Sequence, residues 1–431
     1  MRGLVAVAAS LLLVAACGGT LPSALPSLEI THPIASAPSE APSEEATEEA
    51  QPTKTPKVSA EPTEQTTEEP TEEATPEETP KETELASEEP TPGQGGHTIT
   101  VFAGGGGQAV APSVLAVDAA LQRPTGVSIG SPDSPPHPIT FIVDSNLGIA
   151  FSVENGTISE VIAGLLGPQG VSAEPDVNFG DSNLWVADTA NSRIVTPNGS
   201  GNWQTIAGSS IGQVGFKGDG GPAKRSLLSQ PFDVAGPYIA DTTNHRVRAI
   251  DPKGDIRTIA GNGTQGYGGD NGPATSAELS SPQAIAVGGA DVSKLFIADY
   301  GNFRIREVDL ASDKITTVAG TGDGTAVAYD SKLTGTETPV QRASAIAADN
   351  AGNVYFPVFW GDRGTTIMQL APDGTMTLVA GGGQSTTPGV DATDFVLPDV
   401  LGLAINPYDG SLLICGSDGK VYSVAGVAST L

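Results

Sequence analysis

The chain has 431 residues, of which 50 are acidic and 21 basic, so its formal charge is -29. This acidity argues against nucleic acid and anionic membrane surfaces as partners, because both are bound through clustered Lys and Arg. The 54 glycines are too few for a collagen repeat, and two cysteines cannot build a disulfide framework, so any core depends on apolar burial.

The first 17 residues have the layout of an export signal. Arg2 leads, and the apolar run that follows is too short to span a membrane as a helix. Val14-Ala15-Ala16-Cys17 resembles the lipobox of bacterial lipoproteins, in which the cysteine becomes the first mature residue and carries lipid. The resemblance implies a signal peptide at 1–16, lipid on Cys17 and anchoring to the outer face of the bacterial cell membrane. The alternative is an ordinary signal peptide that happens to contain a cysteine.

Residues 17–97 have the composition of a disordered tether. Positions 18–97 hold 18 Glu, 13 Pro and 13 Thr, but no Asp, Phe, Trp or Tyr. Such a segment cannot bury enough apolar surface to offset its chain entropy. At about 3.1 Å per residue in the polyproline form it reaches at most roughly 250 Å. We expect a spacer that lifts a folded domain off the membrane, although inert filler is compatible with the same composition.

Residues 98–431 contain an internal repeat. A phrase ending in Ala-Gly recurs six times, at Gly104, Gly164, Gly208, Gly261, Gly320 and Gly381. The spacings of 44 to 61 residues, with short apolar β-rich runs between turn residues, favour propeller blades over a helical solenoid. The fourth unit shows four predicted strands, at 284–287, 295–299, 304–308 and 315–319.

The two ends of the repeat region complement each other. A lone strand is predicted at 98–102, whereas the last unit has three strand candidates, Leu401–Ile405, Leu412–Cys415 and Lys420–Val424. We therefore predict an all-β fold, a six-bladed β-propeller over 98–431 whose last blade is closed by the N-terminal strand, which removes exposed edges. Val424-Ala425-Gly426 also resembles the closing phrase, so a count of five blades plus a partial one stays open.

Three units share an Asp-x-x-Asn-x-Arg pattern. It consists of Asp188, Asn191 and Arg193, then Asp241, Asn244 and Arg246, then Asp299, Asn302 and Arg304. With the Gly-Asp-x-Gly-Pro-Ala loops around Asp219 and Asp270, these units resemble NHL repeats, which implies an NHL-like propeller. Units one, five and six depart from the pattern, with Ile149 in place of Arg, Val358 in place of Asp, and a shortened turn at 415–420.

We interpret the repeated set as turn chemistry. Asp can bind nearby backbone amides, Asn tolerates left-handed backbone, and an Arg five residues after the Asp can pair with it through two bonds. His245 belongs to this set and is a weak catalytic candidate. The Asp219 and Asp270 loops lack the closely alternating carboxylates of a calcium site, so a turn is the favoured interpretation.

The sequence predicts no catalytic residue, metal ligand or cofactor. No zinc-ligand spacing or nucleophile elbow occurs among its 4 His and 2 Cys, and Cys415, Trp185 and Trp203 are expected to be structural. Some related propellers are lyases or lactonases with a metal in the central channel. Carboxylates from different blades could converge there without a local signal, so an enzyme of this kind is the alternative function.

Unit five departs most from the Asp-x-x-Asn-x-Arg pattern, with the segment Phe359-Trp360-Gly361-Asp362-Arg363 in its place. Aromatic side chains beside Arg suit protein or glycan contacts, so Phe359, Trp360, Asp362 and Arg363 are candidate ligand contacts on the rim of turns and interblade loops. The competing interpretation is a degenerate blade with a packed Trp360. We predict an exported, membrane-anchored binding or scaffold module for an envelope protein or glycan. As ligand contacts, Trp360 and Arg363 could become Ala with loss of binding and little change in melting temperature.

Overall fold

The computed structural model describes residues 96–111, 113–130, 138–173, 184–198, 202–341 and 343–429. The predicted signal peptide, Cys17 and all but the last two residues of the predicted tether lie outside this part of the chain. Within it, no helix has the length and apolar character needed to cross a membrane.

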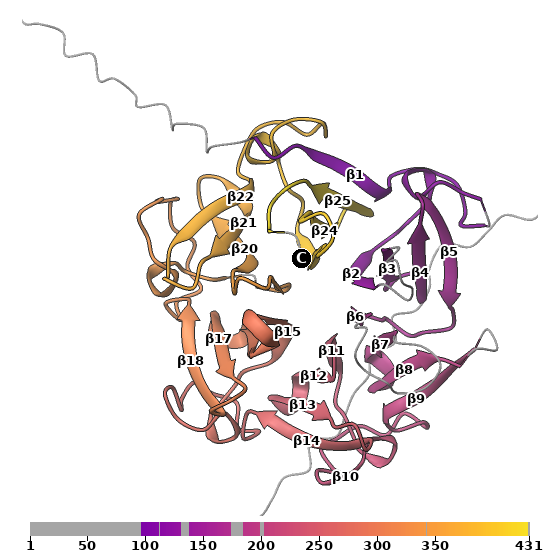
Figure 1. The fold of residues 1–431 in the computed structure, drawn as a ribbon, viewed down its shortest axis with the longest axis vertical. Helices are drawn as coiled ribbons and strands as arrows, with labels where there is room; N and C mark the ends of the chain where they lie inside the picture. The colour runs from indigo at the N-terminus through magenta and orange to yellow at the C-terminus, as the bar shows by residue number, and fades with distance from the viewer. Residues whose placement is uncertain are drawn as a thin grey trace, which may run out of the picture. The chain divides into compact units, whose positions relative to one another are not determined.

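The strands form six antiparallel sheets around one axis, which confirms the predicted all-β, six-bladed propeller (Figure 1). Blade one contains β2 (Pro124–Gly130), β3 (Ile139–Asp144), β4 (Ile149–Glu154) and β5 (Thr157–Ile162). Blade two contains β6 (Val171–Ser172), β7 (Trp185–Asp188), β8 (Arg193–Pro197) and β9 (Trp203–Gly208). The first strands of these two blades, β2 and β6, lie nearest the axis (Figure 1).

The next three blades repeat this order. Blade three contains β11 (Pro231–Ala235), β12 (Tyr238–Asp241), β13 (Arg246–Ile250) and β14 (Asp255–Ala260). Blade four contains β15 (Pro282–Gly288), β16 (Lys294–Asp299), β17 (Arg304–Asp309) and β18 (Lys314–Ala319). Blade five contains β19 (Ala347–Ala348), β20 (Val354–Trp360), β21 (Gly364–Leu370) and β22 (Met376–Gly381).

Blade six joins both ends of the repeat region. Its strands are β23 (Val400–Ile405), β24 (Leu412–Gly416), β25 (Lys420–Val424) and, on the outside, β1 (Ile99–Gly104). β1 pairs with β25 from Ile99 opposite Val424 to Gly104 opposite Lys420. The predicted closing strand is confirmed. Val424 ends a third strand, so the closing phrase at 424–426 does not mark a further one.

The apolar core lies between neighbouring blades. Val247 of blade three packs in one cluster with Ile285 and Ile297 of blade four, because alternate residues of each strand face the next sheet. Cys415 is fully buried in the cluster shared by blades six and one, beside Phe151. Burial raises the pKa of its thiol, as is typical of a structural core cysteine.

Six crossover loops, defined as residues 105–123, 163–170, 209–230, 261–281, 320–346 and 382–399, lead from the outer strand of one blade to the inner strand of the next. Five contain a one-turn 3-10 helix: η1 (Ala116–Asp118), η3 (Ala223–Arg225), η5 (Ala274–Ser276), η8 (Gly335–Glu337) and η9 (Ala392–Asp394). The first residue of each helix is buried and donates its N–H to a carbonyl at the outer edge of the next blade. In blade three the short strand β10 (Gly221–Pro222) also pairs with β14. The crossover loops therefore cover the outer edges of the sheets.

Candidate functional site

The repeated Asp of the NHL-like pattern fixes the end of each crossover loop. In blades one to four its carboxylate accepts the N–H of the residue two positions before a proline, which opens the inner strand in blades one, three and four and lies three residues before it in blade two. The pairs are Gln122 with Asp144 at 2.7 Å, Leu166 with Asp188 at 2.8 Å, Ser229 with Asp241 at 2.8 Å and Ser280 with Asp299 at 2.7 Å. All four aspartates are fully buried. Each joins the turn between strands two and three to the start of the innermost strand, which supports the turn interpretation.

The asparagines and the residues after them complete these turns. Asn191, Asn244 and Asn302 each donate a side-chain N–H to the Asp of their own turn. The left-handed residue is not the Asn but the next position, with φ of 53° at both Ser192 and His245. His245 Nδ1 accepts the N–H of Ser281 at 3.0 Å, so this histidine supports a neighbouring loop.

The predicted pair between the repeated Asp and the Arg five residues later forms in blade two. The prediction of the same pair in blades three and four is wrong. Arg193 Nε lies 2.7 Å from Asp188 Oδ2, through one bond rather than two. Arg246 and Arg304 instead donate to backbone carbonyl oxygens of their own turn and of the following crossover loop. Their side chains lie closer to the surface because the position beside the carboxylate is already filled.

Two arginines that the sequence pattern did not mark fill that position. In blade three, the fully buried Arg248 lies 3.3 Å from Asp241 Oδ2 and 2.6 Å from Asp219 Oδ1. In blade four, Arg306 repeats this geometry with Asp299 and Asp270. Asp219 and Asp270 are thus paired with guanidinium groups, which supports the turn interpretation of their loops. In both blades this Arg stands seven residues after the repeated Asp, at Asp241 and at Asp299.

Aromatic side chains of two crossover loops stack on Arg246 and Arg304. Phe216 lies 3.8 Å from the guanidinium carbon of Arg246, and Tyr267 lies 3.8 Å from that of Arg304. The two rings are 43 % and 45 % exposed. Both stand three residues before the loop Asp, at Asp219 and Asp270, and this equal spacing is the signal that could have identified them.

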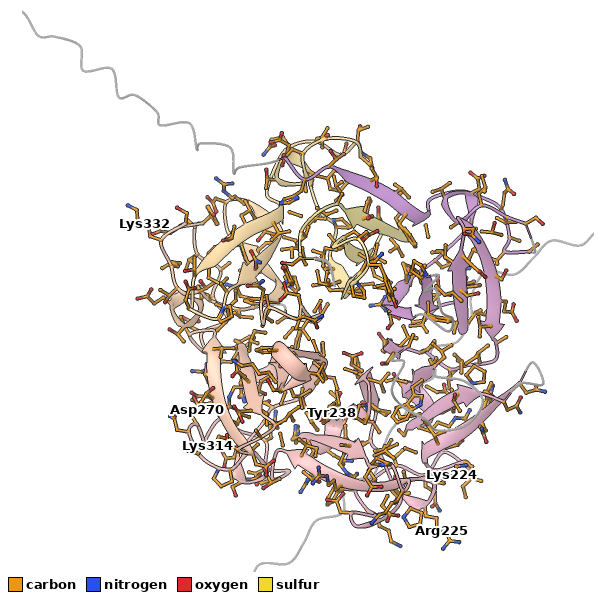
Figure 2. All side chains as sticks on the ribbon, viewed as in Figure 1. Lys224, Arg225, Tyr238, Asp270, Lys314 and Lys332 are labelled. Atoms are coloured by element: carbon orange, nitrogen blue, oxygen red, sulfur yellow. The ribbon has the colours of Figure 1, made fainter. Side chains whose placement is uncertain are left out.

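Exposed apolar side chains gather on the crossover loops. Among the described residues, ten large hydrophobic side chains are exposed, and nine belong to these loops: Leu115, Val117, Leu166, Ile211, Val214, Phe216, Tyr267, Val327 and Val396. The tenth, Val292, lies in the turn between β15 and β16. We call the side of the ring that carries the turns between strands two and three, together with the ends of the crossover loops, the loop face. Charged groups such as Lys224, Arg225 and Lys332 project from the periphery of the ring (Figure 2).

The predicted contacts of unit five are divided between core and surface. Trp360 is only 1 % exposed, donates Nε1–H to Thr366 Oγ1 at 2.8 Å and meets the Tyr329 ring edge-on at 5.2 Å. Trp360 as a ligand contact is therefore wrong for this conformation, because the crossover loop that carries Tyr329 covers it. Arg363 stacks on the same Tyr329 ring at 4.5 Å. Asp362 is exposed.

The other predicted unit-five contacts lie at the surface, whereas the two remaining tryptophans contribute to packing. Phe359 and Arg363 are partly exposed, and both remain candidates for contact together with Asp362. Trp185 is buried, as expected for a structural residue. Trp203 stacks under Arg193 at 4.0 Å and donates its Nε1–H to the backbone carbonyl of Ala163, at the start of the crossover loop that leaves blade one.

A cavity of about 130 Å³ opens at the mouth of the central channel. Residues at or just before the inner strands of all six blades line it, including Arg123, Gln169, Asp233, Gln283, Ser344 and Leu401. The strands approach so closely that a Cβ on Gly170 would lie 2.3 Å from Asp233 Oδ1. Asp233 stands where units one, two and six have Gly126, Gly170 and Gly402, and sequence reasoning missed this contrast.

Asp233 links blades three and four. Its Oδ1 accepts the N–H of Val234 at 2.8 Å, and its Oδ2 accepts the N–H of Ile285 at 2.9 Å. Burial raises the pKa of this carboxyl group to about 7, against the opposing effect of the two backbone donors. Across the described ranges, no group of three or more His, Cys, Asp or Glu is placed to hold a metal ion.

The blades, the ring closure and the repeated Asp contact together define a six-bladed β-propeller with NHL-like repeats. No protein-family profile matches the chain. Part of it is 29 % identical over 154 residues to SUPPRESSOR OF QUENCHING 1, chloroplastic, of Arabidopsis thaliana, covering 33 % of this chain and 14 % of that protein. Human NHL repeat-containing protein 2 is 33 % identical over 84 residues, covering 20 % of this chain and 11 % of that protein. The chain thus matches only a small part of the length of these relatives.

Solved structures share the fold at low sequence identity. A Bacteroides thetaiotaomicron protein described as a candidate phosphatase is 11 % identical, with a TM-score of 0.51 over 76 % of this chain and 78 % of that one. An auxiliary nutrient binding protein from Bacteroides ovatus is 14 % identical, with a TM-score of 0.49 over 77 % and 76 % of the two chains. A streptogramin B lyase is 13 % identical, with a TM-score of 0.43 over 76 % and 97 %. The first of these likenesses supports the fold alone, and a fold does not by itself settle function.

Proposed function

We propose that this chain is a binding module, anchored by lipid on Cys17 to the outer face of a bacterial cell membrane, that contacts a protein partner through its loop face. The observation that carries the proposal is the concentration of exposed large apolar side chains on the crossover loops. Three of them, Ile211, Val214 and Phe216, stand within six residues of one crossover loop, and a group of exposed apolar side chains is typical of a surface that meets a partner.

The chemistry of the loop face favours a protein over a glycan. Ile211 and Val214 are 79 % and 58 % exposed, and aliphatic side chains of this kind gain free energy by desolvation against another apolar surface. Phe216 and Tyr267, each held by an arginine, supply the aromatic and guanidinium groups that are enriched in protein interfaces. A glycan site would be expected to place polar side chains around its aromatic rings, and Ile211 and Val214 do not provide them.

Photo-crosslinking on intact cells tests the face and the partner together. A photoreactive phenylalanine analogue replaces Ile211 in one version of the full chain and Val292 in another. Both positions are exposed and apolar, at 79 % and 59 %, but only the first lies on a crossover loop. We expect one protein to be captured from position 211 and not from position 292.

A variant and a chemical label complete the test. Replacing Val214 and Phe216 by Ser in the position-211 version should remove capture while the chain stays folded by circular dichroism. Equal capture from both positions, or capture that survives this double substitution, would refute a partner on the loop face. The anchor is tested separately, since lipid labelling should be lost in Cys17→Ala.

A further inference from the structure

The cavity at the mouth of the central channel, which Asp233 helps to line, is separate from the exposed apolar side chains of the crossover loops. It measures about 130 Å³, close to the roughly 150 Å³ of an engineered cavity that holds benzene. A ligand of about six heavy atoms is therefore the right size. Six blades contribute its walls, so the pocket exists only in the closed ring.

Among the described residues that line this cavity, Asp233 is the only acidic one. Its two carboxylate oxygens accept one backbone N–H each. A carboxylate offers about four acceptor positions, so about half of this capacity remains for a ligand. The N–H of Ile285 comes from the next blade, which fixes the carboxylate relative to both walls.

In the part of the chain that the structure describes, no cation is paired with this carboxylate. Arg123 is the other ionisable residue among the described residues that line the cavity. Burial is the dominant influence on the pKa of Asp233, with two backbone donors opposing it. An anion that has lost water without gaining a counter-charge is stabilised most by a cation.

An ammonium group fits this lining better than a divalent metal. It has three N–H donors on one centre, one of which can meet the Asp233 carboxylate, and Gln169 and Gln283, which also line the cavity, are the nearby residues with amide oxygens for the others. A calcium ion takes six to eight oxygen ligands, normally with several carboxylates, and only one carboxylate is present here.

We propose that the channel mouth binds a small molecule carrying a protonated amine, with Asp233 as its counter-ion and Gln169 and Gln283 as additional acceptors. Arg123, from blade one, supplies a positive group on another wall of the pocket. An amine that also carries a carboxylate therefore binds more tightly than a simple amine of similar length.

Titrations of the purified full chain followed by NMR test the proposal with three probes. Butylamine, 4-aminobutanoate and the uncharged butan-1-ol are similar in length and differ in charge. We expect saturable binding of both amines, tighter for 4-aminobutanoate, and none of the alcohol. Because the pKa of Asp233 is about 7, affinity for butylamine should rise about ten-fold between pH 6 and pH 8.

Three variants locate the site. Asp233→Asn, which keeps the shape of the side chain, should abolish binding of both amines while the melting temperature confirms that it is folded. Arg123→Gln should weaken binding of 4-aminobutanoate and leave butylamine unchanged. Asp362→Asn removes an exposed carboxylate that is not part of the cavity lining and should change neither. Binding that survives Asp233→Asn, equal binding of the alcohol, or saturable binding of calcium with none of either amine would overturn the proposal.

Discussion

Arg306 Nη2 lies 2.6 Å from Asp270 Oδ1, so a strand of blade four holds the crossover loop that arrives from blade three. Its other terminal nitrogen, Nη1, lies 3.2 Å from Asp299. The side chains of Arg306 and Asp299 are both fully buried. Removing this one guanidinium would therefore release the loop and also leave Asp299 without its cation.

Replacing Arg306 by Met should lower the free energy of unfolding by about 3–5 kcal/mol, because one partner of a buried ion pair is lost. Arg304→Met is the matched control in the same strand. Arg304 is partly exposed and donates to backbone carbonyls, so its loss should cost about 1 kcal/mol. Urea unfolding of the full chain measures both values, and equal small losses would show that the Asp299–Arg306–Asp270 network contributes little.

Trp360→Ala should be strongly destabilising, in contrast to the expectation from sequence that it would leave the melting temperature unchanged. Removing a fully buried Trp leaves a cavity and costs about 3–5 kcal/mol. Arg363→Ala removes a partly exposed side chain and should cost less than about 1 kcal/mol. Thermal unfolding distinguishes the two. A melting temperature unchanged in Trp360→Ala would restore this residue as a surface contact.

Ring closure can be tested by a disulfide across the last blade. Thr100 and Ser423 face each other in the β1–β25 ladder. Thr100→Cys with Ser423→Cys, in a chain that also carries Cys17→Ser, should form a disulfide under oxidation and gain about 3–5 kcal/mol of stability that reductant removes. Moving the second cysteine to Thr377 in blade five should give no bond. Deleting residues 98–104 should destabilise the domain, and unchanged stability would contradict the shared blade.

Asp233 should make the protein less stable as the pH rises. Its pKa is about 7 in the folded state and about 3.9 when unfolded, so between these values the folded chain binds the additional proton. Stability from this group is complete below about pH 4 and falls until about pH 7. Asp233→Asn should remove this decline, although it also loses one of the two backbone N–H bonds because an amide has a single acceptor oxygen. Identical pH profiles for the two proteins would contradict a raised pKa.

The blades and their closure could be predicted because their signals are local and repeated. The recurring Ala-Gly phrase marks the end of an outer strand, and the unpaired strand at 98–102 matched a missing one in the last unit. Arg248 could not be assigned in the same way, since its partner Asp219 lies on a loop that returns along the blade edge. The exposure of Trp360 depends on Tyr329 from a loop about thirty positions earlier. The position of Asp233 in a cavity could not be predicted, because residues from all six blades form that cavity.

The pairing of Ile99 with Val424 spans 325 positions of the chain. Blades one to five are each built from consecutive strands, so each can form from a contiguous stretch of sequence. Blade six requires the first strand and the last three together, and this ladder has the longest sequence separation of those described. Contacts of high separation slow folding. The β1–β25 ladder therefore carries the largest loop-closure cost among the described ladders, and it joins the two ends of the repeat region into one ring.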